Sequence, residues 1–105
     1  MAERTELHTL LCGIMESEAG EAHVYFQPPE GFKLEYPCIV YEREKIESKF
    51  AANLPYMHKN RYALTMISKD PDSGIPERIA ELPMCEHSRH FVNDNLHHDA
   101  FTIYY

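Results

Sequence analysis

The feature that most constrains the fold is a run of alternating side chains at residues 60–68. The even positions from 62 to 66 hold Tyr, Leu and Met, and the odd positions from 63 to 67 hold Ala, Thr and Ile. Successive side chains of a β-strand point to opposite faces, so this alternation is typical of an extended chain. The run predicts a β-strand, and a sheet is therefore an obligatory part of the fold.

The N-terminal region has the period of an amphipathic helix. Leu7, Leu10, Leu11 and Ile14 recur at i, i+3, i+4 and i+7, the spacing that places side chains on one helix face. Charged residues occupy the other faces. The pattern predicts a helix over residues 2–17.

A second, shorter helix is predicted after an Asp-Pro-Asp-Ser-Gly turn at residues 70–74. Pro76 suits the first helical position, where a missing N–H costs little. Ile75, Ile79 and Leu82 share one face, and the proline that follows ends the helix.

Four further strands are predicted from apolar runs bounded by turn residues. The first is the arm of a hairpin that turns at Pro-Pro-Glu-Gly. The second is β-branched and aromatic on both faces, as in a central strand, and the last two form an antiparallel hairpin. These strands are residues 23–26, 36–41, 84–92 and 98–105.

The order of these elements predicts an α+β fold, with two helices on one face of a mainly antiparallel sheet of about four to five strands. The length of 105 residues is that of one domain, so we expect residues 1–105 to form a single unit. A hydrophobic content of 44% is too high for a disordered chain.

A charged segment follows the second predicted strand and continues to residue 56. It has no sustained apolar face and is predicted to be a long exposed loop or flap, either simply solvated or ordered against a partner. The candidate interface residues within it are Glu42, Arg43, Glu44, Lys45, Ile46, Glu47, Ser48, Lys49 and Phe50.

Composition narrows the classes of function. The formal charge of −7 argues against binding to a phosphate backbone as the main activity. No apolar run approaches the roughly 18 residues of a membrane span, and the N-terminus lacks the pattern of a signal peptide. Cys12, Cys38 and Cys85 are few and far apart, as expected of reduced core residues made in a cytosol-like compartment.

Histidines near the C-terminus raise the question of a metal site, with Cys85, His87 and His90 on one strand and His97 and His98 on the next. In a regular strand His90 points away from the other two, and no motif supplies the remaining ligands. A Cys–His nucleophile pair is conceivable, but its local signatures are absent. The sequence thus predicts no enzyme, metal or cofactor, and a small metal-dependent enzyme is kept as an alternative.

Several motifs together carry a resemblance to a known family. These motifs are residues 36–42 (Tyr-Pro-Cys-Ile-Val-Tyr-Glu), 60–65, 70–73, 75–76, 82–83, 89–99 and 101–105. Through them the chain resembles the small tail-terminator or tail-completion (head-tail joining) proteins of long-tailed bacteriophages with non-contractile tails.

The resemblance implies a structural virion protein of the phage neck, made in the host cytoplasm. Such a protein forms a hexameric ring that caps the tail tube, ends its growth and joins it to the head-side connector or stopper protein. DNA would only pass through the lumen, and residues 42–50 would be the arm between subunits. The adaptor and stopper proteins of the neck have similar sizes and remain alternatives, as does a regulatory binding module such as an antirepressor.

Overall fold

The computed structural model describes residues 4–51 and 54–105, and the side chains of 4–46 and 60–105. The described residues form an α+β fold, as predicted. The elements are α1 (Arg4–Ala19), β1 (Val24–Phe26), β2 (Cys38–Ala51), β3 (Leu54–Ser68), α2 (Ile75–Ala80), β4 (Cys85–Asn93) and β5 (Leu96–Tyr104).

The strands form one sheet in the order β1-β2-β3-β5-β4. Three of its four pairings are antiparallel, in agreement with the prediction of a mainly antiparallel sheet. β1 instead runs parallel to β2, with Val24 opposite Ile39. The predicted hairpin after residues 23–26 is therefore wrong, because residues 27–37 carry the chain back to the end of the sheet where β1 starts.

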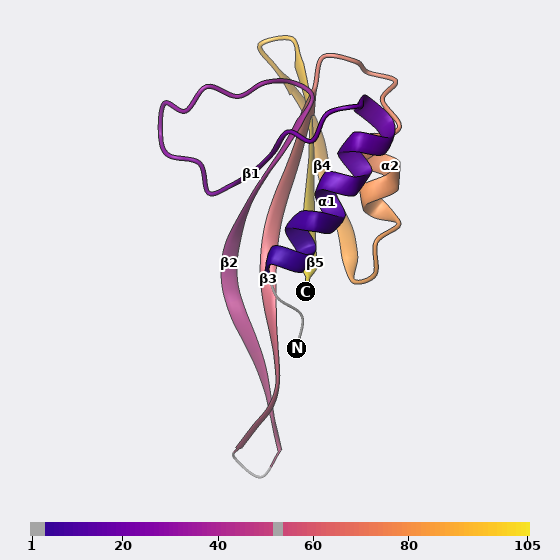
Figure 1. Ribbon diagram of the computed structural model, residues 1–105. Coiled ribbons are helices and arrows are strands. Elements are labelled where there is room, and N and C mark those ends of the chain that lie inside the picture. Colours follow the sequence, from indigo (N-terminus) through magenta and orange to yellow (C-terminus); the bar gives the residue numbers. More distant parts are fainter. Residues whose placement is uncertain (1–3, 52–53) are drawn as a thin grey trace.

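Both helices lie on the same face of the sheet (Figure 1). Leu7, Leu11 and Met15 of α1 are completely buried, and α2 contributes Ile75 and Ile79. The sheet side chains that pack against the helices include Tyr62, Leu64 and Met66 of β3, the residues that the alternation predicts on one face. The sheet residues of this core are Ile39, Tyr41, Tyr62, Leu64, Met66, Phe101 and Ile103.

One residue of the predicted helix face lies outside this core. Leu10 is 39% exposed, whereas Met15 is buried. An α-helix turns by about 100° per residue, so the buried stripe of Leu7, Leu11, Ile14 and Met15 is centred between Leu7 and Leu11 and leaves Leu10 at its edge. The helix also ends at Ala19, two residues beyond the predicted end.

The charged segment predicted to be an exposed loop is in fact part of a β-hairpin. β2 continues through it to Ala51, and β3 begins at Leu54 instead of residue 60. The strands pair antiparallel along this length, with Ile46 opposite Asn60. The prediction failed because it required an apolar face. Strand pairing needs only backbone donors and acceptors, so a ribbon outside the layered body can carry many charges.

Residues 45–51 and 54–60 form an extension, and we call the segment 45–60 the arm. The pairing of β3 with the C-terminal part of the chain ends at Asn60. The backbone of Asn60 exchanges two hydrogen bonds with that of Tyr105, at 3.3 and 2.9 Å. Beyond this point, within the described residues, β2 and β3 pair only with each other. Figure 1 shows the arm projecting from one end of the molecule, which measures 51 × 28 × 23 Å.

The C-terminal hairpin of β4 and β5 is confirmed, with strand bounds that differ by one or two residues and a tighter turn than predicted. Only Asp94 and Asn95 lie between the strands. Their φ angles are 53° and 62°, and two successive positive values are those of a type I′ turn. Asp and Asn adopt this conformation more readily than most other residues.

Candidate interface sites

The predicted interface segment, residues 42–50, forms the root and the β2 side of the arm. Glu42, Arg43, Glu44 and Ile46 are exposed, and Ile46 reaches 55%. The side chains of residues 47–50 lie outside the described part of the chain. The described portion therefore combines charged side chains with an accessible aliphatic one. Protein interfaces commonly have this combination, with apolar residues at the centre and polar ones at the rim.

Contacts at the root fix where the arm leaves the body. The Arg61 Nε atom of β3 lies 2.8 Å from Glu44 Oε2 of β2, so an ion pair bridges the two strands. The Gln27 side-chain oxygen accepts a hydrogen bond from the backbone N–H of Arg43 at 3.3 Å. Together with the Asn60 backbone pair described above, these contacts set the direction of the arm from the folded body.

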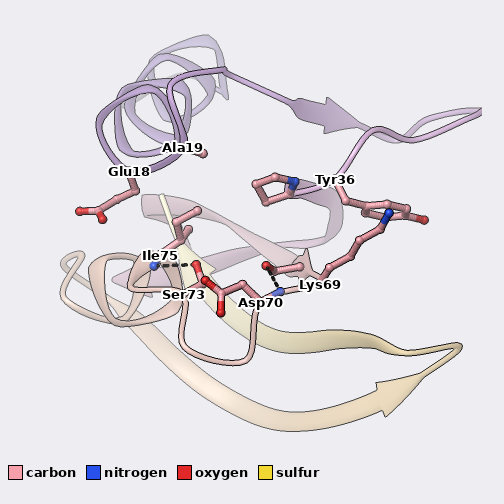
Figure 2. A pocket seen from close by; sticks show the side chains of 9 residues that line it. Glu18, Ala19, Tyr36, Lys69, Asp70, Ser73 and Ile75 are labelled. Carbon is pink, nitrogen blue, oxygen red and sulfur yellow. Dashed lines mark hydrogen bonds between the residues drawn. The ribbon is translucent and has the colours of Figure 1, made fainter.

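A groove of about 320 Å³ lies at the end of the body away from the arm. It is bounded by the end of α1, by residues 36–37 before β2, and by the turn from β3 into α2. Apolar side chains such as Ile75 lie in its lining beside polar and charged ones (Figure 2). The lining residues are Glu18, Ala19, Tyr36, Pro37, Ser68, Lys69, Asp70, Ser73 and Ile75.

Side-chain to backbone hydrogen bonds shape the wall of the groove at residues 68–75. The Asp70 carboxylate accepts a bond from the N–H of Asp72 at 2.9 Å, and the Ser68 hydroxyl accepts one from the N–H of Asp70 at 3.0 Å. The Ser73 hydroxyl accepts a third from the N–H of Ile75 at 3.3 Å. These are the local bonds that made the turn predictable. The position of α1 beside it has no local signal in the sequence.

An ion pair ties the two helices together at the groove. The Arg78 guanidinium of α2 donates to Glu18 Oε1 of α1 at 2.6 Å. This bond holds the Glu18 carboxylate at the rim while leaving the side chain partly accessible. The groove is thus a structured feature of the body, built from both helices and the turn between β3 and α2.

The C-terminal histidines are arranged differently from the prediction. His87 Nε2 and His90 Nδ1 lie 3.1 and 2.9 Å from the same Asp99 oxygen, so the two rings share a face. A bulge between His87 and Arg89 inserts the extra residue that turns His90 to this face. Cys85 packs against the hydrophobic core. Among the described side chains, those of residues 4–46 and 60–105, no group of three or more His, Cys, Asp or Glu is placed to hold a metal ion.

The three cysteines are free thiols, and burial opposes their ionisation. Cys38 is completely buried, which raises its pKa to about 12. Burial also raises the pKa of Cys85, and burial followed by the charge of Glu16 raises that of Cys12. A nucleophilic cysteine reacts as the thiolate, so these surroundings disfavour that role.

One polar cluster beside the core was not predicted. The Tyr41 hydroxyl lies 2.8 Å from His8 Nδ1 and accepts a bond from Arg4 Nη1 at 3.2 Å. The Arg4 guanidinium also lies 4.3 Å from the centre of the Phe26 ring. The partners of Tyr41 are more than 30 positions away in the chain, so sequence spacing gives no sign of them.

Neither a protein-family model nor a curated protein matches the chain. Among the described residues, no helix has the length and apolar character needed to cross a membrane.

Proposed function

We propose that this chain is a structural, non-enzymatic subunit of a phage neck, of the tail-terminator or tail-completion type. In this proposal it assembles into a ring of six subunits that caps the tail tube and ends its polymerisation. The ring also joins the tube to the head-side connector, and DNA passes through its lumen. The protein is then made in the host cytoplasm and resides in the virion.

The observation that carries the proposal is the arm. A hairpin of two strands is at best marginally stable in water, because each strand has only one neighbour and little apolar surface is buried. An arm of this kind gains stability when it lies on another protein surface. A ring subunit needs such an element, since each copy presents one surface to the next copy and a different one to the previous copy.

The position in the neck rests on the resemblance described above. The order of elements that accompanies this resemblance is the order in the structure, with the charged segment as a hairpin in place of a loop. The acidic balance of the chain supports a lumen that DNA can traverse, since like charges at short range disfavour adhesion.

The experiment that tests the proposal combines native mass spectrometry with electron microscopy of tail tubes. We expect one discrete oligomer, and rings at the ends of tubes assembled with the tail-tube protein. A protein that stays monomeric and never associates with tubes would contradict the proposal. Rings that bind the head connector but not the tube would instead favour an adaptor or stopper role.

An arm-deletion variant makes the same test specific. Replacing residues 47–59 by Asn-Gly would join Ile46 to Asn60 through a two-residue turn that suits an antiparallel hairpin. The deletion leaves every residue of the described hydrophobic core in place. We expect this variant to fold and remain monomeric. A shortened protein that still forms the same oligomer would show that the arm is not the assembly element.

A further inference from the structure

Charge is divided unevenly between the arm and the body. The arm, residues 45–60, contains Lys45, Lys49 and Lys59 but only one acidic residue, Glu47, so its formal charge is +2. The whole chain carries −7, which leaves −9 on the remaining residues. The arm is therefore the basic part of an acidic protein, and an acidic surface would be its electrostatic complement.

The groove has the character needed to receive such an arm. Glu18 and Asp70 line it, and the exposed Glu35 and Asp72 are next to residues that line it. Two cations offset these four carboxylates, Lys69 in the lining and Arg78 in its ion pair with Glu18, so the formal charge of the six residues is −2. The apolar lining residues Ala19, Pro37 and Ile75 can pack against aliphatic and aromatic side chains. The uncharged stretch from residue 50 to 57 of the arm contains Phe, Leu, Tyr and Met.

The arm of one molecule cannot reach the groove of the same molecule. β3 runs straight from one to the other, with Asn60 at the root of the arm and Ser68 in the wall of the groove. Eight residue steps in a strand span roughly 26 Å. The arm points away from the groove along this line (Figure 1), so an arm in the groove must come from a second molecule.

We infer that the groove between α1, residues 36–37 and the β3–α2 turn is the docking site for the arm of a neighbouring copy of this chain. The contact is heterologous, because a basic arm on one side meets an acidic groove on the other. This inference rests on the proposed function and deepens it by naming the surface that receives the arm.

Zero-length cross-linking of the wild-type protein provides the direct test. A carbodiimide couples lysines to carboxylates in contact, and mixing isotope-labelled with unlabelled protein distinguishes coupling between copies from coupling within one. We expect mixed-isotope links from Lys49 or Lys59 to Glu18, Glu35, Asp70 or Asp72. Links between copies that join the arm lysines only to other carboxylates would overturn the inference.

A matched pair of substitutions provides the second test. Ala19 and Ala80 are both exposed alanines in the last turn of a helix, but only Ala19 lines the groove. Ala19→Arg places a large cation in the groove and should weaken self-association by about tenfold or more, which is about 1.4 kcal/mol. Ala80→Arg should leave association nearly unchanged. Thermal melting of both variants shows whether each retains the fold.

Reversing the charges on both the arm and the groove should restore association, which a variant with a folding defect could not do. The pair Lys49→Glu and Lys59→Glu should weaken association, and adding Glu35→Lys and Asp72→Lys should restore it. If the wild-type protein assembles but Ala19→Arg has no more effect than Ala80→Arg and the reversed charges give no rescue, the groove assignment fails while the ring proposal stands. A wild-type protein that is monomeric at every concentration contradicts both.

Discussion

The Tyr41 hydroxyl and the His8 Nδ1 atom lie 2.8 Å apart, and this contact connects the first turns of α1 to β2. Tyr41 is 1% exposed, and Arg4 donates to the same hydroxyl. The hydroxyl is therefore the centre of a small network at the edge of the core. The network joins two segments that the sequence separates widely.

Removing this hydroxyl tests the network. Tyr41→Phe keeps the ring and its packing but leaves the polar atoms of Arg4 and His8 without this partner. The expected loss of unfolding free energy is about 1–2 kcal/mol, the range for a broken hydrogen bond with partly buried partners. Urea denaturation of both proteins measures it. A variant as stable as the wild type would show that water replaces the hydroxyl at no cost.

The surroundings of His8 predict a dependence of stability on pH. Burial, and secondly the charge of Arg4, lower the pKa of His8 in the folded protein. The unfolded chain therefore takes up a proton at His8 first as the pH falls below about 6.5, and the contribution of His8 to stability declines from there down to the pKa in the folded protein. We expect the wild type to lose more stability than His8→Gln between about pH 7.5 and 5.5. Equal losses would contradict the prediction, since both proteins share the other histidines.

Neighbouring leucines on α1 test the placement of its buried face. Leu11 is completely buried and Leu10 is 39% exposed. Leu11→Ala should cost about 2–5 kcal/mol of stability through the lost apolar contact and the cavity left behind, while Leu10→Ala should cost clearly less. Thermal or chemical denaturation compares the two variants. Similar losses would mean that the helix is rotated from the position described above.

The buried thiol of Cys38 should resist chemical modification. Its pKa of about 12 keeps the thiol neutral at about pH 8, and no part of the residue is exposed. Alkylation of the native protein followed by mass spectrometry should label Cys12 and Cys85 before Cys38. Denaturant should make all three react at similar rates. Rapid labelling of native Cys38 would indicate that the start of β2 opens readily.

Much of the fold is predictable from local patterns. The alternation at residues 60–68, the spacing of Leu7 and Leu11, and the Asp-Ser turn before α2 each correspond to an observed element. The side chains of these segments meet one shared core, so local preference and tertiary packing favour the same structure.

The features that the sequence did not predict depend on contacts between segments that are far apart in the chain. The charged segment is a strand because β3 pairs with its backbone, whatever its side chains are. His90 shares a face with His87 because a bulge changes the period of two. The groove exists because α1 ends beside the turn at residues 70–74. Each of these requires knowledge of which distant segments are neighbours.

The two edges of the sheet have a consequence for behaviour at high protein concentration. One edge strand, β1, is only three residues long, and the other, β4, is interrupted by the bulge next to the exposed Arg89. Short, irregular and charged edges are poor templates for intermolecular strand addition. We therefore expect the body of the concentrated protein to resist amyloid-like aggregation. A mutation that removes the bulge in β4 would increase aggregation by more than its small effect on folding stability suggests.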